Sequence, residues 1–412
     1  MPAGGAIGIE RTEYHARQRA ALGLARERGF SAVVAWSRGG STQDHYADVN
    51  YLTGFYTHQP FIPDEPGRWR AHGHTAFVLP GDGPATLLMD MTELQDPRPV
   101  ADRVHLTEDL VGSLATILAE TVPPGADVAL LGGEALAWRW GRELGARLPE
   151  HRLVEADDLA AELRLIKSAA ELDLVRAAGE VGTRALTAAM EAAVPGATEA
   201  GVAAAAISEI VSSGGALYGL GLSSGPWAHT FSPSTPAAYS RRRLEAGDMV
   251  RLDLYGSLEG YLFDFGRSRV VGRPPTQQQQ EMLDAVRDSV QAGTELLLPG
   301  ATLGAVARRC EEVLGASSYA RRHGTPETTM GGTWGHSLGL DWGRPWIRSN
   351  SPTVLEPGMC FAIERRIEAP GLGGANYENN VIVTEAGPEV VTLAPDRYGE
   401  RRDGPSDPPD RA

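Results

Sequence analysis

Cysteine is nearly absent from this chain of 412 residues, which contains only Cys310 and Cys360. Neither belongs to a Cys-x-x-Cys pair, which argues against a disulfide framework and against a cysteine-type zinc site. Long apolar runs are missing too, since no stretch approaches the ~18 apolar residues of a membrane span. Residues 1–10 lack the basic start and apolar core of a signal peptide. We therefore expect a soluble, cytoplasmic protein with no membrane partner.

An excess of basic residues is also missing. Lys and Arg total 38 against 53 Asp and Glu, which gives a formal net charge of −15. Nucleic acids bind basic surfaces, so this composition predicts no nucleic-acid partner. The hydrophobic share of 42% and the charged share of 22% are ordinary for a globular protein, and the length allows two domains.

Helix and strand patterns divide the chain into two parts. They alternate over residues 10–160, which predicts a small α/β domain. Residues 161–397 are expected to form a second, catalytic domain, and residues 398–412, with three prolines among charges, a disordered tail. The fold class is therefore α+β. The patterns of the second part predict helices over 157–190, 198–213, 277–298 and 303–314, and strands over 249–255, 261–265, 359–367 and 381–384.

Two carboxylates stand inside the apolar strand patterns around residue 258. The segment 256–260 has the length and composition of a hairpin loop. A hairpin would bring Asp253 and Asp264 side by side on one face. Paired carboxylates repel each other and are costly to desolvate, and a bound cation removes that cost. The alternative is two solvated aspartates on an exposed hairpin.

Three further charged or imidazole groups stand in similar surroundings. His336 lies in the Gly-rich loop 331–339, Glu364 ends an apolar strand, and Glu378 precedes another. Two Asp, two Glu and one His provide hard oxygen ligands and one imidazole, a set that suits two adjacent divalent ions. Each residue taken singly is more often a salt-bridge or strand-edge residue than a metal ligand.

The order of these residues resembles the pita-bread metallopeptidase family, which includes aminopeptidase P, prolidase, methionine aminopeptidase and creatinase. The likeness covers roughly residues 10–395, and the segment 163–171 resembles the start of the family's catalytic domain. Asn50-Tyr-Leu-Thr-Gly-Phe55 resembles the N-terminal domain of the creatinase/prolidase branch. The catalytic motifs that match are Asp253-Leu-Tyr, Asp264-Phe-Gly-Arg267, Gly335-His336-Ser-Leu-Gly-Leu, Leu355-Glu-Pro-Gly-Met359 and Glu378-Asn-Asn-Val-Ile-Val-Thr384.

This resemblance implies two bound divalent metal ions, Mn²⁺ first, with Co²⁺, Zn²⁺ and Fe²⁺ as alternatives. Asp253 would chelate one ion, and Asp264 and Glu378 would bridge both. His336 and Glu364 would hold the second ion. A water or hydroxide between the ions would attack an amide or peptide carbon, and Glu364 would move the proton as general base and acid.

Aromatic and basic residues near these motifs predict the substrate pocket. Arg can bind a carboxylate in a bidentate manner, and Trp can cover a cation or an apolar ring, so a small anionic or zwitterionic substrate is expected. The alternative is that the Trp residues fill the core and the Arg residues are solvated. The substrate-binding candidates are His229, which matches a substrate-contacting histidine of the family, with Trp334, Trp342, Arg344, Arg366 and Tyr56. By similarity to creatinase-like dimers, Tyr56 would reach a neighbouring protomer's pocket, which implies a homodimer.

One position departs from the family pattern. The peptidase branches usually carry a second histidine about seven residues after the Gly-His pair, where this chain has Gly343. Three functions follow. The first is a dinuclear-metal hydrolase resembling Xaa-Pro dipeptidase or aminopeptidase. The second is a small-molecule C–N hydrolase of the creatinase or ectoine-hydrolase type, or a lyase, and Gly343 favours it. The third is a non-catalytic binding module, against which the complete ligand set argues.

Overall fold

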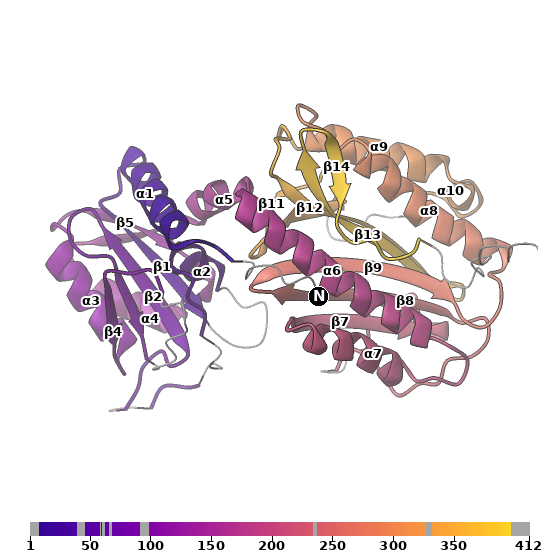
Figure 1. Ribbon diagram of the computed structural model, residues 1–412, viewed down its shortest axis with the longest axis horizontal. Helices are drawn as coiled ribbons and strands as arrows, with labels where there is room; N and C mark the ends of the chain where they lie inside the picture. The colour runs from indigo at the N-terminus through magenta and orange to yellow at the C-terminus, as the bar shows by residue number, and fades with distance from the viewer. Residues whose placement is uncertain are drawn as a thin grey trace, which may run out of the picture.

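The computed structural model describes residues 8–38, 46–57, 59, 62–65, 68–90, 99–233, 237–326 and 332–396. It has two lobes, which we call the N-terminal lobe (up to residue 165) and the C-terminal lobe (from residue 169), as Figure 1 shows. The predicted tail at 398–412 lies outside the described residues. Within the described ranges, no helix is both long enough and apolar enough to cross a bilayer.

The N-terminal lobe is built on a six-stranded mixed sheet in the order β4-β3-β2-β1-β5-β6. Alternate residues of the central strand β1 face opposite cores: Val33 packs in the core beneath α1, α2 and α5, and Val34 in the core beneath α3 and α4. Helices therefore cover both faces of the sheet, and the predicted α/β architecture is confirmed. The elements are α1 (Arg11–Glu27), β1 (Ala32–Arg38), α2 (Ala47–Thr53), β2 (His74–Pro80), β3 (Thr86–Met89), β4 (Arg103–Leu106), α3 (Leu110–Thr121), β5 (Asp127–Leu131), α4 (Trp138–Arg147), β6 (Arg152–Glu155) and α5 (Asp157–Leu165).

The C-terminal lobe contains two antiparallel sheets, β7-β8-β9 and β11-β10-β12-β13-β14. Helices α6 and α7 pack on the first sheet, α8 packs on the second with α9 against it, and β9 lies against β13 where the sheets meet (Figure 1). The elements are α6 (Ala169–Ala192), α7 (Glu199–Ser212), β7 (Ala216–Ser224), β8 (Met249–Leu258), β9 (Tyr261–Val270), α8 (Gln277–Thr294), α9 (Leu303–Ala316), α10 (Ser318–His323), β10 (Gly335–Leu338), β11 (Trp342–Trp346), β12 (Cys360–Ala369), β13 (Gly373–Thr384) and β14 (Gly387–Val390).

The junction between the lobes is a break between two helices. Ser168 accepts a hydrogen bond from the backbone N–H of Glu171, and the Glu171 carboxylate accepts one from the backbone N–H of Ser168. This capping box starts α6 and ends the continuous helix predicted over 157–190. We propose domains at 10–160 and 161–397, as the sequence predicts, with α5 spanning their boundary.

The hairpin that carries the two aspartates is longer than predicted. Strand β8 continues to Leu258 and β9 begins at Tyr261, so the predicted loop 256–260 is wrong. The turn consists of Glu259 and Gly260, with φ of 51° and 82°. Two left-handed residues match the right-handed twist of the flanking strands, which is why a two-residue turn closes this hairpin.

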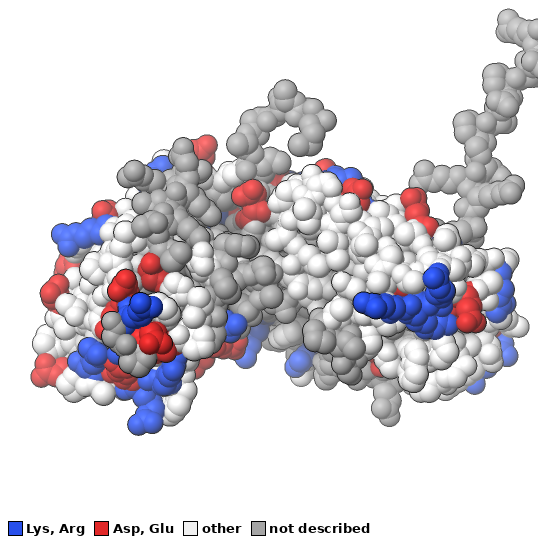
Figure 2. All heavy atoms as spheres, turned by 90° about the horizontal axis from the view of Figure 1, so that it is seen from below, with Lys and Arg blue, Asp and Glu red and all other residues white. Residues whose placement is uncertain are grey.

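Charges of both signs share the surface of the N-terminal lobe. On the face drawn in Figure 2, acidic and basic side chains are interspersed over that lobe. A surface of mixed sign offers a polyanion no continuous basic track on that face.

Candidate metal centre

Five candidate ligands lie on five neighbouring strands of the C-terminal lobe. Asp253 on β8 pairs with Gly266, and Asp264 on β9 pairs with Tyr255, so the two aspartates are diagonal neighbours on one face of the hairpin. Glu364 on β12 pairs directly with Glu378 on β13. His336 on β10 pairs with Ala362 and therefore shares the face of Glu364.

The predicted local settings of three ligands are wrong, although the residues are placed together. His336 lies in strand β10 and not in a loop, and Glu364 and Glu378 lie inside β12 and β13 and not at strand ends. Charged residues can occupy these strand interiors because they all face one shared cluster. A cation bound within that cluster would offset the cost of removing each carboxylate from water.

Three of the ligands lie within direct reach of one ion. One ligand atom each from Asp264, His336 and Glu378 lies within 4.8 Å of the other two. The His336 Nε2 is 3.5 Å from an Asp264 oxygen. Asp253 and Glu364 adjoin this group, because the charges of both act on Glu378. The five side chains therefore form one electrostatic cluster.

The tautomer of His336 leaves the correct nitrogen for a metal. Its Nδ1 lies 3.0 Å from the Ser337 carbonyl, an acceptor only, so Nδ1 carries the hydrogen and donates it. In the neutral ring Nε2 then presents its lone pair, which can bind a metal, and in the protonated ring Nε2 donates to the Asp264 carboxylate. A histidine ligand is commonly oriented in this way, with the second nitrogen bonded to a carbonyl or carboxylate.

Burial and mutual repulsion make the carboxylates hard to ionise without a cation. Burial, followed by the charges of Asp264 and Glu364, raises the pKa of Asp253 to about 8. Burial and the neighbouring carboxylates likewise raise the pKa of Glu364 and of Glu378 above their usual range. Burial alone would lower the pKa of His336, but its hydrogen bond to Asp264 and the nearby negative charges raise it.

An orphaned oxygen shows that the cluster fits a metal. The Asp253 Oδ1 is buried and has no hydrogen-bond partner in the described part of the chain. An acceptor of this kind is costly to bury unless it coordinates a cation. Four carboxylates and one imidazole are the donors that Mn²⁺, Co²⁺, Zn²⁺ or Fe²⁺ accept, so the residues fit a site for divalent ions.

Amide side chains from β13 hold the ligand strands in register. Asn380 accepts a hydrogen bond of 2.9 Å from the backbone N–H of Asp264 and donates to its carbonyl. Asn376 donates to the Leu252 carbonyl at 3.1 Å, and a Cβ at Gly266 would overlap its side-chain nitrogen. Glycine at 266 therefore lets β13 approach β8 and β9 closely.

Three of the substrate-binding candidates lie at the ligand cluster or beside the strand β13 that carries one of its ligands. Arg366 and Trp342 lie at the cluster: the charge of Arg366 acts on Asp253, Glu364 and Glu378, and the Trp342 ring is 6.4 Å from the His336 ring, edge to face. His229, half-buried, stacks on Trp227 with its ring 6.4 Å away, and its backbone faces Gly374 on β13.

The remaining three candidates differ in their surroundings. Trp334 has no exposed surface and packs in the core beneath α8 and α9, so it presents nothing to a substrate. Arg344 is exposed on β11, two residues after Trp342. Tyr56 lines a cavity between the lobes and meets Tyr46 edge-on at 4.9 Å.

Sequence reasoning missed three residues on the ligand face of the first sheet. Arg251 and Tyr255 flank Asp253 at alternate positions of β8. The guanidinium groups of Arg251 and Arg366 stack on the Phe231 ring, 5.7 Å and 5.5 Å from its centre. Period-two alternation within β8 could have revealed Arg251 and Tyr255. Phe231 leaves no such signal, because a tertiary contact places it.

The Arg251 side chain is buried with an unused donor. It is 1% exposed, and its Nη1 donates to Glu368 at 3.1 Å. Its Nη2 is buried and finds no acceptor among the residues described. Burial lowers the pKa of this guanidinium. A charged donor left unsatisfied beside the cluster indicates a place for an anionic group.

Comparison with known proteins identifies both lobes. Residues 173–385 match the model of metallopeptidase family M24, and residues 17–166 match that of the creatinase/prolidase N-terminal domain. The chain is 31% identical to a probable dipeptidase PepE of Mycobacterium tuberculosis over 340 residues, which is 78% of this chain and 84% of that protein. It is 31% identical to an Xaa-Pro dipeptidase of Pyrococcus furiosus over 245 residues, 57% of this chain and 65% of that protein.

Solved structures share the fold over nearly the whole length. The prolidase from Pyrococcus horikoshii superposes with a TM-score of 0.76 at 21% identity, covering 92% of this chain and 99% of that one. The dipeptidase PepE from Mycobacterium ulcerans superposes with a TM-score of 0.75 at 26% identity, covering 94% and 98%.

Proposed function

Because the chain belongs to metallopeptidase family M24, and is therefore a metal-dependent hydrolase, we propose that it cleaves Xaa-Pro dipeptides. The observation that carries this proposal is the cluster of Asp264, His336 and Glu378, with Asp253 and Glu364 beside it and an arginine pair next to it. The dipeptidases among its relatives support the substrate class.

Five residues would hold the two divalent ions, in the roles that the sequence predicts. Asp253 would chelate one ion, Asp264 and Glu378 would bridge both, and His336 and Glu364 would hold the second. When bound, the ions would supply Lewis acidity and a lowered pKa of water at the reaction site. We propose Mn²⁺ as the native metal, since four carboxylates outnumber one imidazole.

An unsatisfied arginine donor favours a substrate with a free carboxylate. Arg251 pairs with Glu368 through its Nη1, while its buried Nη2 finds no acceptor among the residues described. A dipeptide carboxylate would accept a hydrogen bond from that Nη2 beside the centre.

Glu364 would act on the proton. Burial raises its pKa, which makes this carboxylate a better proton acceptor than an exposed glutamate. It would take the proton of the attacking water and deliver it to the leaving nitrogen of proline. His229 would contact the substrate from the loop beside β13, and Trp342 would cover the opposite side near His336.

A second candidate function rests on Gly343. No side chain stands at this position of β11, where the peptidase pattern places a histidine, and a Cβ there would meet nothing closer than Asp341 at 3.7 Å. A small-molecule C–N hydrolase of the creatinase type, or a lyase, would not need that imidazole. We further propose that the protein is cytoplasmic and homodimeric, which its acidic composition and creatinase-type N-terminal domain support.

The test is a substrate comparison on metal-reconstituted protein. Protein stripped with chelator and reloaded with Mn²⁺ should release proline from Ala-Pro and Met-Pro, act much more slowly on Ala-Ala, and lose activity again with chelator. Arg251→Lys should raise KM for Ala-Pro about tenfold and leave slow turnover of Ala-Pro-amide unchanged, whereas Arg19→Lys, exposed on α1, should alter neither. Hydrolysis of creatine without Xaa-Pro cleavage would favour the second candidate and refute the first.

A further inference from the structure

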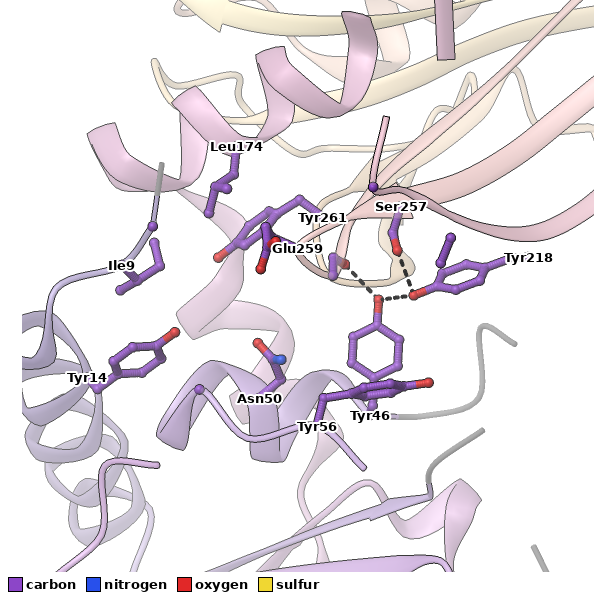
Figure 3. A pocket seen from close by; sticks show the side chains of 15 residues that line it. Ile9, Tyr14, Tyr46, Asn50, Tyr56, Leu174, Tyr218, Ser257, Glu259 and Tyr261 are labelled. Atoms are coloured by element: carbon purple, nitrogen blue, oxygen red, sulfur yellow. Dashed lines mark hydrogen bonds between the residues drawn. The ribbon is translucent and has the colours of Figure 1, made fainter. Parts of the chain in front are cut away.

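The cavity between the two lobes, which Tyr56 lines, has a volume of about 280 Å³. Its lining shares no residue with the five candidate ligands. Figure 3 shows its walls: α1 and α2 of the N-terminal lobe below, and α6 with the β8–β9 turn of the C-terminal lobe above. Tyrosine dominates the lining, with Tyr14, Tyr46, Tyr56, Tyr218 and Tyr261.

A one-way chain of hydroxyl groups fixes one wall of this interlobe cavity. Ser257 donates to Tyr218 at 2.9 Å, Tyr218 donates to Tyr46 at 2.8 Å, and Tyr46 donates to the Gly260 carbonyl at 2.6 Å (Figure 3). Each of these three hydroxyl groups therefore donates a hydrogen bond to the next group in the series. The rings of Tyr46 and Tyr218 are therefore held as rigid aromatic walls, and their hydroxyls are committed to one another.

Three other polar groups of the lining make no such bonds. The Tyr14 hydroxyl, the Asn50 amide and the Glu259 carboxylate come from α1, α2 and the β8–β9 turn, and none of the three side chains hydrogen-bonds within the described part of the chain. In Figure 3 they point into the same space from different sides. Groups from three separate elements thus converge without satisfying each other.

Glu259 occupies a costly backbone position. Its φ is 51°, a left-handed conformation that Asn or Gly adopts with less strain at this place in a two-residue hairpin turn. Its carboxylate enters no ion pair among the described residues. A strained residue with an uncommitted charge at the edge of a cavity indicates a role in binding.

The convergent groups match the donors of a primary ammonium. An –NH₃⁺ group has three N–H donors and no acceptor, and the Glu259 carboxylate, the Asn50 carbonyl oxygen and the Tyr14 hydroxyl can each accept one. Tyrosine faces attract a cation, and Ile9 and Leu174 supply apolar surface for the rest of the ligand.

The cavity has no cation of its own to compete. Neither Lys nor Arg belongs to its described lining. Arg17, whose guanidinium lies 5.3 Å from the Tyr14 ring centre, is already paired with Glu13 and Glu171. We propose that this interlobe cavity binds a protonated primary amine with a small apolar or aromatic body. The site is independent of the catalytic centre, so its test needs no turnover.

The probe is phenethylammonium chloride, titrated calorimetrically into full-length, metal-loaded protein. We expect saturable binding of one molecule per chain. Glu259→Asn removes the carboxylate and suits the left-handed turn, so it should fold at least as stably as the parent and bind the probe at least tenfold more weakly. The exposed Glu191→Gln, a matched loss of one negative charge on α6, should bind it unchanged.

Two further titrations separate the alternatives. The neutral 2-phenylethanol and the quaternary trimethylphenethylammonium should each bind at least tenfold more weakly, because the first lacks the charge and the second lacks the N–H donors. Asp264→Asn, which impairs the metal centre, should still bind phenethylammonium. The proposal is overturned if no saturable binding occurs, if Glu259→Asn binds the probe as tightly as the parent, if the quaternary ion binds equally well, or if Asp264→Asn abolishes binding.

Discussion

Glu364 carries two demands that pull in opposite directions. As a metal ligand it must be ionised, and as the group that moves a proton it must accept one near neutral pH. Its direct partner across the strands is Glu378, and the charge of Asp264 acts on it as well. Burial raises its pKa, while His336 acts in the opposite direction. Burial therefore favours proton uptake by Glu364, whereas His336 favours the ionised form that binds a metal.

Replacing this carboxylate by an amide should separate the two demands. Glu364→Gln keeps the size of the side chain and one potential ligand oxygen, but it cannot accept the proton, so kcat on Ala-Pro should fall by roughly 10²–10⁴. The thermal midpoint should stay near that of the parent. Rates and metal content are measured on the same Mn²⁺-loaded sample. The exposed Glu356→Gln serves as control, and turnover within a few-fold of the parent would refute the role of Glu364.

At the scale of elements, two glycines on β7 leave room for other side chains of the site. Gly221 pairs with Asp253, and Gly219 pairs with Tyr255. A Cβ at Gly221 would lie 2.7 Å from the Phe231 ring, closer than packed atoms approach. The Phe231 ring can therefore lie against β7 beside Asp253, in contact with the two guanidinium groups.

Adding one methyl group at this position should disturb the substrate pocket more than the fold. In Gly221→Ala the Phe231 ring must move away from Arg251 and Arg366, so KM for Ala-Pro should rise about tenfold, roughly 1.4 kcal/mol of binding, with kcat less affected. Gly145→Ala on α4, where a Cβ meets nothing within 4 Å, is the control and should leave kinetics unchanged. An unaltered KM in Gly221→Ala would show that Phe231 does not shape the pocket.

The strands that hold the ligands differ in how far the sequence predicts them. Alternation in β8 and aromatic residues in β9 predicted where both strands begin but not how far they extend, and the ligand order identified the family. The strand setting of His336 was missed, because the glycines around it favour a loop locally and only pairing with β11 and β12 makes it a strand. Contacts between distant segments, such as Phe231 with Gly221, leave no trace in local periodicity, so the pocket walls could not be predicted.

One buried histidine makes the stability of the N-terminal sheet depend on pH. His74 on β2 is 2% exposed, and its Nδ1 accepts a hydrogen bond of 3.0 Å from the Trp36 indole on β1. Protonated imidazole cannot accept that bond. Burial, followed by the charge of Arg38, lowers the pKa of His74 to about 4.

This shift predicts acid sensitivity in a defined window. Below pH ~6.5 the unfolded chain binds a proton that the folded chain refuses down to about pH 4. Stability should therefore fall as pH decreases across that window, by up to about 3 kcal/mol. His74→Gln can still accept from Trp36 and should remove this part of the slope in urea titrations at several pH values, whereas the exposed His105→Gln should keep it. An equal slope in all three proteins would contradict the prediction.

For the whole molecule, ion pairs join the two lobes that form the walls of the interlobe cavity. Arg164 on α5 lies 3.3 Å from Asp48 on α2 and 2.8 Å from Asp341 in the C-terminal lobe. Arg17 on α1 lies 2.6 Å from Glu13 and 3.3 Å from Glu171 on α6, and its guanidinium stacks 4.3 Å from the Tyr51 ring centre. The side chains of Arg17 and Glu171 are each 5% exposed, so this pair is protected from solvent.

Removing Arg17 should therefore weaken the junction between the lobes. In Arg17→Met the buried Glu171 carboxylate loses its cation across the junction, and breaking a buried pair by removing one partner typically costs about 3–5 kcal/mol. Glu171 belongs to the capping box at the start of α6. The stability that is lost is therefore that of the contact between α1 and the start of α6. We expect the thermal unfolding of the variant to split into two transitions, one for each lobe, in differential scanning calorimetry. The exposed Arg19→Met on the same helix should unfold like the parent, and an unsplit, unshifted transition in Arg17→Met would show that apolar packing alone couples the lobes.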